Sequence, residues 1–269
     1  MITVDSFYQK LQCPQSCYLG KKIFKKHFFE LNLNVTDKKA FSQDIEKITW
    51  AYTLKPETIN IAQYTDDEKE YLEIAVIEVT LQSPKRQKRI GEIIQRAIPY
   101  PVLLIFVHGE EIALNVAEKR INRSDSSKIM AETVHDTPWL SPDHADGWQK
   151  EFLHDFCVTN FSYHTFYDFY QDMVQRIIAL NCAVHTGRYC LTTEHTEYTE
   201  TAEKTVFYHT SEEIDGRLER LKELERLQQE QMGIRNRLKK EKNMGSMVEL
   251  NTKLKQLADR IKEILDLGF

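Results

Sequence analysis

Two glutamates, Glu73 and Glu78, are the residues of this sequence whose type and setting point first to chemistry. They lie in the segment EYLEIAVIEVTLQS, whose many apolar residues predict a buried strand. A basic stretch, PKRQKRIG, follows it directly. Carboxylates can hold Mg²⁺, and lysine and arginine side chains can contact phosphate. The chemistry to consider is therefore metal-assisted cleavage of a phosphodiester.

The spacing of these carboxylates departs from that of a known class of magnesium-dependent nucleases. In nucleases of the PD-(D/E)xK type, an acidic residue and an E-x-K motif on neighbouring strands hold the metal ion beside the phosphate. Thr80 stands here where that motif has lysine, and residues five positions apart point to opposite faces of a regular strand. We therefore favour a non-catalytic protein that uses no cofactor and no metal. A degenerate or cryptic PD-(D/E)xK-like nuclease, with Glu73 and Glu78 as catalytic residues, stays the alternative hypothesis.

Six basic residues are the candidates for contact with nucleic acid. Four of them lie in the first turns of a predicted helix, where positive charge opposes the helix dipole at a cost that phosphate contact can offset. A solvated helix end explains the same pattern. The whole chain carries a net charge of -5, so contact with DNA must come from such a local patch and is expected to be weak. The candidates are Lys85, Arg86, Lys88, Arg89, Lys119 and Arg120.

Other common site signatures are absent from the sequence. It contains no HExxH zinc motif and no GxxxxGK[ST] or GxGxxG phosphate loop, and its five cysteines form no CxxC pair. No run of about 18 apolar residues predicts a membrane span. The first residues lack the basic start and apolar block of a signal peptide. We expect a cytoplasmic protein with reduced thiols and no membrane contact.

Hydrophobic periodicity changes repeatedly along residues 1–190. An apolar stripe at spacings of three and four predicts a helix over 36–48, with Thr36 as its N-cap. Runs of β-branched and aromatic residues predict strands, and a segment that begins with proline predicts a helix between two of them. This order predicts an α/β (or α+β) body in which helices flank a mixed sheet. The predicted strands are 48–55, 70–82, 101–107 and 111–118, with a helix over 84–98 and a hairpin turn at 108–110.

The remaining segments of the body have weaker signals. Residues 21–30 indicate a short helix, and 122–147 carry turn-forming residues without a clear period, which predicts a long surface excursion. Two helices are predicted after it, 148–156 and 162–187, the second ending at Gly187. The aromatic stripe on the second helix predicts packing on the core, with a base-stacking platform as the alternative.

The C-terminal part differs in composition from the body. Residues 191–210 include a threonine- and glutamate-rich stretch that predicts a linker, and 211–269 are charged and helix-favouring, with an apolar seam at spacings of three and four. The seam loses phase near Asn243 and Gly245, which predicts a helical hairpin, with one continuous helix as the alternative. We expect this coiled-coil-like seam to bind a protein partner or a second copy of the chain. Its residues are Leu224, Leu227, Ile234, Leu238, Leu250, Leu254, Leu257 and Ile261.

Several segments resemble, in the same order, those of the bacterial domain-of-unknown-function family 4391, a methylase-associated family. They are DIEKITWAYTLKPETINI, EYLEIAVIEVTL, RIGEIIQRAIPYPVLLIF, AEKRIN and NFSYHTFYDFY. The resemblance spans the body and, more loosely, the helical tail, and it names no catalytic residues. It implies a setting, because such proteins are similar to those encoded beside a helicase and a DNA methyltransferase in restriction-modification-like or phage-defence loci.

The resemblance and the residue patterns leave two hypotheses. The first is a non-catalytic accessory or scaffold subunit that holds a helicase or a DNA methyltransferase through its C-terminal helices. The second is a subunit that acts on or binds nucleic acid, with a nuclease-like fold. A metal-dependent cleavage assay separates the two, and so does the position of Glu78 relative to other carboxylates.

Overall fold

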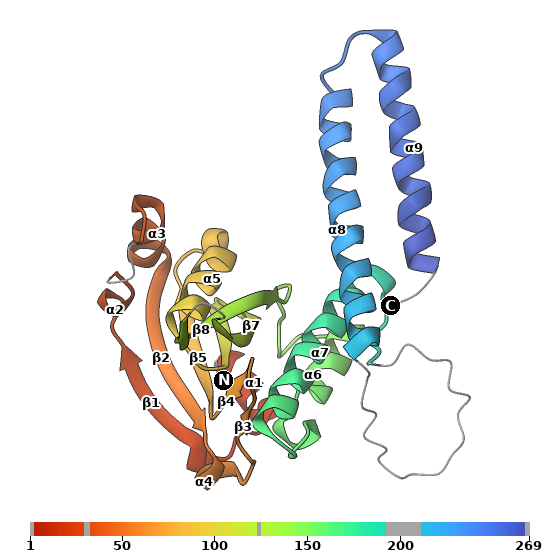
Figure 1. Ribbon diagram of the computed structural model, residues 1–269. Coiled ribbons are helices and arrows are strands. Elements are labelled where there is room, and N and C mark those ends of the chain that lie inside the picture. The colour runs from red at the N-terminus through yellow and green to blue at the C-terminus, as the bar shows by residue number, and fades with distance from the viewer. Residues whose placement is uncertain (1–2, 30–32, 123–124, 192–210, 267–269) are drawn as a thin grey trace, which may run out of the picture. The chain divides into compact units, whose positions relative to one another are not determined.

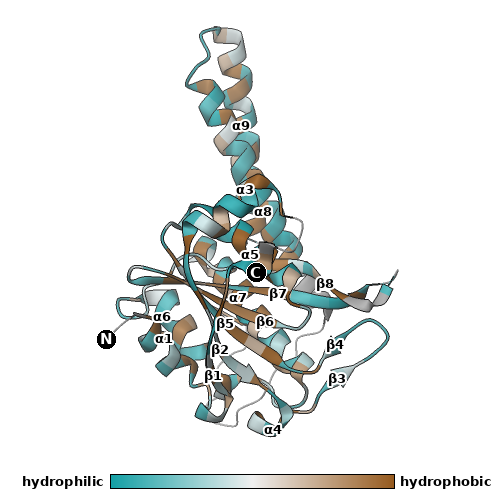
Figure 2. Ribbon diagram, turned by 90° about the vertical axis from the view of Figure 1, so that its left-hand side faces the viewer, coloured by the Kyte–Doolittle hydropathy of each residue, from teal (hydrophilic) through white to brown (hydrophobic). Residues whose placement is uncertain are grey.

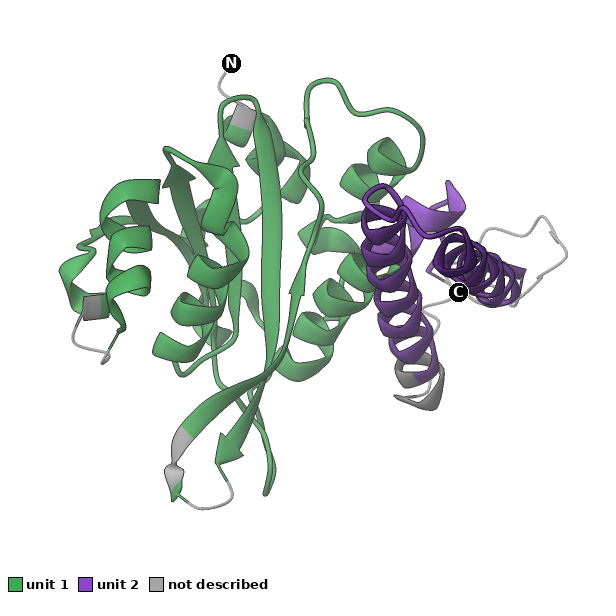
Figure 3. Ribbon diagram, turned by 90° about the horizontal axis from the view of Figure 1, so that it is seen from above, with its two compact units in different colours: residues 1–180 green, residues 181–269 purple. Residues whose placement is uncertain are grey.

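The computed structural model describes residues 3–29, 33–122, 125–191 and 211–266 (Figure 1). The chain divides into two compact units, residues 1–180 and 181–269, and each is described by itself (Figure 3). The first unit is a mixed α/β body. The second unit contains two long helices.

A six-stranded sheet forms the centre of the first unit, with the strand order β1-β2-β5-β6-β7-β8. Its neighbouring strands are antiparallel except β5 and β6, which are parallel. A parallel pair needs a crossover connection, and helix α5 (Gln87–Ala97) supplies it. The mixed sheet with flanking helices confirms the predicted fold class. The strands are β1 (Tyr18–Ile23), β2 (Ile45–Leu54), β5 (Ile74–Leu81), β6 (Val102–His108), β7 (Glu111–Asn122) and β8 (Asp125–Asp136), beside a separate ribbon of β3 (Tyr64–Thr65) and β4 (Glu70–Tyr71).

Helices lie on both faces of this sheet. Helix α5 packs its isoleucines into the core on one face. Helix α1 lies on the opposite face, because its Tyr8 reaches Glu78, whose side chain points away from the core residues Ile77 and Val79. The other helices of the body are α1 (Thr3–Leu11), α2 (Lys26–Phe29), α3 (Val35–Lys39), α4 (Pro56–Ile59), α6 (Gly147–Asp155) and α7 (Phe166–Thr186), with single turns at Gln15–Cys17, Ala40–Asp44, Pro84–Arg86 and Val158–Asn160.

The two central strands explain why the body folds around this sheet. Strand β5 is buried along its length except at Glu78 and Thr80, and β6 is buried from Val102 to Val107. Hydrophobic residues gather in these strands (brown in Figure 2). A strand covered on both faces needs such a run of apolar side chains, each of which stabilises the fold by about 1.5–3 kcal/mol when it leaves water.

Helix α7 confirms the prediction that its aromatic stripe belongs to the core. All members of that stripe are buried, and buried rings have no face left for a base. The helix ends at Thr186, and Gly187 follows with φ +71° and donates its amide to the Ala183 carbonyl at 2.8 Å. This left-handed glycine is the predicted C-terminal cap. The buried stripe consists of Phe166, Phe169, Tyr170, Met173, Ile177 and Leu180.

The predicted helix over 36–48 is wrong in its second half. Helix α3 covers only Val35–Lys39, a single π turn follows, and β2 begins at Ile45. Asn34, and not Thr36, caps α3, because its side-chain oxygen accepts a hydrogen bond from the Asp37 amide at 2.8 Å. Apolar residues three apart, such as Ile45 and Ile48, fit a helix by spacing alone, but pairing with β5 draws both into the sheet.

Two further segments differ from the prediction because they form the edges of the sheet. Residues 18–23 form β1, where a helix was expected from residue 21, and 125–136 form β8, where a surface excursion was expected. Edge strands are exposed along one side, so they keep polar and charged residues and lack an apolar run. Pairing with β2 and β7, which no local pattern encodes, makes them strands.

The second unit confirms the predicted pair of packed C-terminal helices. Helix α8 (Ser211–Leu238) and helix α9 (Met244–Asp266) lie side by side, joined by residues 239–243 (Figure 1). The break precedes Gly245, which lies in the first turn of α9 and is not the residue that breaks the helix. Asn243 caps α9 instead, since its Oδ1 accepts a hydrogen bond from the Ser246 amide at 3.1 Å.

Candidate functional site

Glu78 lies in the middle of β5, on the face that α1 covers. Its Oε2 accepts a hydrogen bond from the Tyr8 hydroxyl at 3.2 Å, and its cross-strand neighbours are Thr49 of β2 and Ile105 of β6. Burial, and then the nearby Glu78 carboxylate, raise the pKa of Tyr8 far above its usual range. The tyrosine therefore stays protonated and keeps donating to Glu78.

Glu73 does not join Glu78 in one site. It precedes β5 and pairs with Lys55 at 3.4 Å. Thr80, which replaces the lysine of the nuclease motif, has Lys47 as its cross-strand neighbour on β2. Within residues 3–29, 33–122, 125–191 and 211–266, no group of three or more histidine, cysteine, aspartate or glutamate side chains is placed to hold a metal ion.

Two arginines of the proposed nucleic-acid cluster are held by carboxylates. Arg86 contacts both oxygens of Asp44, at 2.5 and 2.9 Å. Arg89 donates to both oxygens of Asp37, at 2.9 and 2.7 Å, and to Glu92 at 2.8 Å. Hydrogen bonding from Arg89 lowers the pKa of Asp37. These bidentate ion pairs attach the start of α5 to the segment before β2. Both guanidinium groups are therefore occupied by carboxylates within the protein.

The other four candidates have unlike surroundings. Lys85 and Lys88 are exposed to water at the start of α5. Arg120 pairs with Glu132 of β8 at 2.9 Å. Lys119 is only 2% exposed, which removes it from the surface that could meet a phosphate. The six residues therefore form no common patch. Of the six, only Lys85 and Lys88 are exposed and have no carboxylate partner among the described ion pairs.

Lys119 holds the C-terminal end of α5. Its Nζ donates to the carbonyl oxygens of Gln95 and of Ile98, the latter at 3.0 Å. The last carbonyls of a helix lack partners within the helix, and a lysine supplies them here. Burial lowers the pKa of Lys119 to about 7. Lys119 is thus a structural cap on the crossover helix.

A chain of hydrogen-bonded polar side chains continues from this cap, and no sequence pattern predicted it. The Gln95 Nε2 donates to the Asn115 Oδ1 at 2.9 Å and to the Val102 carbonyl at 3.0 Å. Asp136 of β8 accepts hydrogen bonds from Asn115 at 2.9 Å and from Gln87 at 2.8 Å. The chain ties α5 to three strands. Glutamine in an amphipathic helix usually faces water, which is why the pattern alone does not reveal it.

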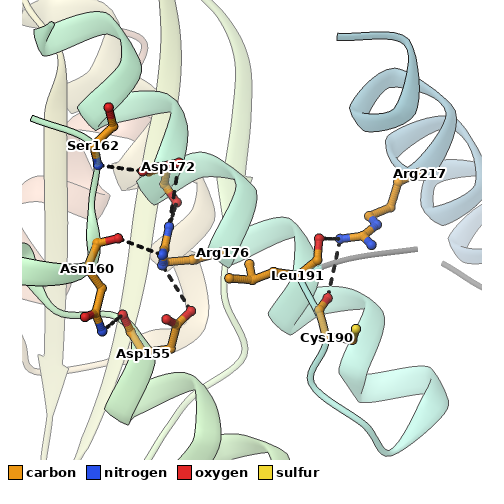
Figure 4. A network of polar contacts seen from close by, with 8 residues as sticks. All are labelled: Asp155, Asn160, Ser162, Asp172, Arg176, Cys190, Leu191 and Arg217. Carbon is orange, nitrogen blue, oxygen red and sulfur yellow. Dashed lines mark hydrogen bonds and ion pairs between the residues drawn. The ribbon is translucent and has the colours of Figure 1, made fainter. Parts of the chain in front are cut away.

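The buried Arg176 forms a separate polar network that joins α6 to α7 within the first unit (Figure 4). Arg176 pairs with Asp155 at 3.0 Å, donates to the Asn160 carbonyl at 3.0 Å and lies 5.0 Å from the Phe161 ring centre. Asp172 accepts the Ser162 amide at 2.7 Å. These contacts fix the turn between the two helices.

In the second unit, Arg217 has a comparable structural role (Figure 4). It is buried near the start of α8 and donates to the carbonyls of Cys190 and Leu191, at 3.4 and 3.2 Å. Burial lowers the pKa of Arg217. The contact connects the chain that follows α7 to the first turns of α8, although the residues between them lie outside the described ranges.

A cavity of about 600 Å³ lies beside α1 and α6. Its lining includes Lys10, Lys150, His154 and the thiol of Cys157. The Cys157 Sγ lies 3.2 Å from the Thr159 hydroxyl, and no hydrogen bond joins it to His154 in the described structure. A reactive cysteine needs a partner that favours its thiolate, so this geometry does not indicate nucleophilic catalysis.

The predicted seam residues of the tail pack largely against each other. Leu224 and Leu227 of α8 form a cluster with Ile264 of α9, and Leu257 and Ile261 pack against it. Ile234 is also buried, whereas Leu238, Leu250 and Leu254 are half-buried. The buried residues of the seam therefore hold α8 and α9 together. The half-buried residues remain partly exposed to solvent.

These features define a protein with a mixed α/β body and a C-terminal helical hairpin. Buried charged residues such as Asp37, Lys119 and Arg176 pair with other groups within the protein. A protein-family profile described as Domain of unknown function (DUF4391) matches residues 11–261. The chain belongs to this family, as its segments predicted. Comparison with curated proteins and with solved structures gave no match. Among the residues with described positions, no helix is long and apolar enough to cross a membrane.

Proposed function

We propose that this protein is a non-catalytic accessory subunit that binds a helix of a partner protein on its C-terminal hairpin. The proposal places it in a bacterial restriction-modification-like or phage-defence system, where a helicase or a DNA methyltransferase is the partner. The setting rests on the segments that resemble the family. The binding mode rests on the hairpin.

The half-covered apolar stripe of α9 is the observation that carries the binding mode. Helix α8 buries Leu221, Leu224, Leu227 and Ile234, whereas Ile264 is the one buried residue of α9 within the described range. The other members of the α9 stripe are half-buried, and their spacing of three and four suits packing against another helix. A third amphipathic helix would complete their burial.

The first turns of α9 expose two further apolar side chains, on the side of the helix next to the half-buried stripe. Met244 is 76% exposed and Val248 is 63% exposed, and residues four apart share one face of a helix. Methionine adapts its shape to a partner, and exposed apolar patches mark interaction sites. Charged residues on the outer positions keep the hairpin in solution without a partner.

Co-purification tests the proposal directly. The tagged chain is co-expressed with the helicase or DNA methyltransferase encoded beside it, and the complex is measured by size-exclusion chromatography with light scattering. The double variant Met244→Glu/Val248→Glu should weaken the complex by about tenfold or more, because it puts charge into an apolar contact. The control Gln229→Glu/Asn236→Glu adds the same charge at exposed polar positions of α8 and should leave the complex intact.

Three results would count against the proposal. The wild-type chain could bind neither enzyme, the two double variants could weaken the complex equally, or removal of residues 211–269 could leave the complex unchanged. Homodimers that persist in the presence of both enzymes would mean that a second copy of the chain, and not a partner enzyme, covers α9.

The second candidate is a subunit that acts on nucleic acid. Its nuclease form is not favoured by the position of Glu78, whose close contact is the Tyr8 hydroxyl. A subunit that binds nucleic acid without cleaving it agrees better with the exposed basic residues of the body. The basic residues that favour binding lie outside the cluster at the start of α5.

A further inference from the structure

Strand β1 forms one edge of the sheet (Figure 1). It carries part of a cluster of exposed basic residues. Residues 18–27, YLGKKIFKKH, contain four lysines, one histidine and no acidic residue, in a chain whose net charge is -5. One of the lysines, Lys25, is used internally and donates to the Ile45 carbonyl. None of the other three lysines forms an ion pair with a carboxylate that the structure describes. The exposed members of this segment are the cations Lys21, Lys22 and Lys26 and the imidazole of His27.

An exposed aromatic ring lies among these cations. Phe24 is 55% exposed, and the Nζ atoms of Lys22 and Lys26 lie 5.9 and 5.7 Å from its ring centre. The His27 ring is 6.2 Å away, centre to centre. A nucleobase can stack on such a ring while the neighbouring ammonium groups contact the phosphates on either side. We call Lys21, Lys22, Phe24, Lys26 and His27 the basic edge.

The register of β1 places cations on both sides of the sheet edge. Lys21 pairs with Trp50 and Lys22 with Thr49, so the two side chains point to opposite faces. A phosphate backbone that runs along the edge would meet positive charge from both sides. A flexible single-stranded nucleic acid can follow this edge better than a rigid duplex can.

A protein strand is a poorer fit to the same edge. The pairing of β1 with β2 slips between Tyr18 and Lys21, and Gly20 lies there with φ +63°. This positive φ favours glycine, because other residues rarely adopt it. Bulges and lysines on an edge are the devices that prevent strand addition.

We propose that the basic edge is a binding site for single-stranded nucleic acid. Phe24 provides the stacking platform, and the three exposed lysines contact phosphates. The site lies in the first unit and is separate from the hairpin, so its test does not depend on the accessory role proposed above.

Fluorescence anisotropy of the full chain tests this site with a labelled oligo(dT) of about a dozen nucleotides, a length that such surfaces accommodate. The wild type should bind, with affinity that falls as salt rises, and a duplex of equal length should bind more weakly. Phe24→Ala should weaken binding by about fivefold or more through lost stacking. Lys22→Glu/Lys26→Glu should weaken it by about tenfold or more and flatten the salt dependence.

The control is Lys85→Glu/Lys88→Glu, which changes the net charge by the same amount at the exposed lysines of the α5 cluster. It should retain wild-type affinity to within about twofold. Circular dichroism checks that each variant keeps the wild-type fold. Equal losses in both lysine double variants would overturn the proposal, and so would an unaffected Phe24→Ala. Tighter binding to duplex, or binding to anionic phosphatidylserine vesicles but not to oligo(dT), would overturn it as well.

Discussion

Replacing Lys119 by methionine is expected to flatten the pH dependence of the stability of the body. Lys119 is 2% exposed, and burial lowers the pKa of its ammonium group from 10.5 to about 7. A neutral amine still has two N–H donors, which match the carbonyls of Gln95 and Ile98. The folded protein can therefore release this proton near neutral pH without losing either hydrogen bond.

The sign and size of the effect follow from proton linkage. Because the folded-state pKa is lowered, the unfolded chain binds more protons than the folded chain between about pH 7 and pH 10.5, so the free energy of unfolding rises with pH in that window. From about pH 6 to about pH 8, a group with these two pKa values adds about 1.4 kcal/mol to the free energy of unfolding. Methionine has no proton to release and removes this contribution.

Urea unfolding followed by tryptophan fluorescence measures the difference. Trp50, Trp139 and Trp148 all belong to the first unit, so the signal reports the body. Between about pH 6 and pH 8, the wild type should gain about 1.4 kcal/mol more than Lys119→Met. Lys88→Met removes an exposed lysine of α5 and should keep the wild-type slope. Equal slopes for the wild type and Lys119→Met would refute the reasoning, because Lys119 would then hold its proton equally in both states.

Three further predictions concern other contacts. Arg176→Met should lower the free energy of unfolding of the body by about 3 kcal/mol in the same assay, because it removes a buried guanidinium that pairs with Asp155 and donates to the Asn160 carbonyl. Gln171→Met on the same helix is the control, and a loss as large as that of Arg176→Met would point to general packing. Asn243→Ala should speed hydrogen exchange at the start of α9 and cost about 1 kcal/mol of cap energy, whereas the mid-helix change Asn251→Ala should not. Glu78→Gln should change stability by less than about 1 kcal/mol, since the amide oxygen still accepts the Tyr8 hydroxyl, and wild-type protein should show no Mg²⁺-dependent DNA cleavage. Cleavage that is lost in Glu78→Gln would instead support the nuclease hypothesis.

Local sequence patterns predicted the strands and helices that bury an apolar face against the rest of the protein. Strand β5 and the α5 helix both show their burial as a run or a stripe, and both were predicted close to their observed bounds. The edge strands β1 and β8 were not, because half of each faces water and the other half is defined by a partner strand far away in sequence. The two C-terminal helices were predicted because a seam at spacings of three and four is a local signal.

The candidate sites were less accessible to prediction than the fold. The sequence shows that Arg86 and Arg89 are basic, but not that Asp44 and Asp37 lie beside them. The buried amide of Gln95 is equally invisible, since its partner Asn115 lies two strands further along the chain. Each of these contacts depends on tertiary placement, which periodicity does not encode.

Position in the sheet therefore decides what each basic segment of this chain can do. The arginines of α5 lie over the face where the segment before β2 brings two buried carboxylates, so their charge is consumed in fastening the helix. Lys119 lies on β7, between other strands, and its ammonium group turns inward to the end of α5. Lys21 and Lys22 lie on β1, the edge of the sheet that the described strands form, and their side chains are exposed to water. We therefore place the proposed binding surface at residues 21–27, whose exposed lysines form no ion pair with a described carboxylate, and not at residues 85–89, whose arginines are paired.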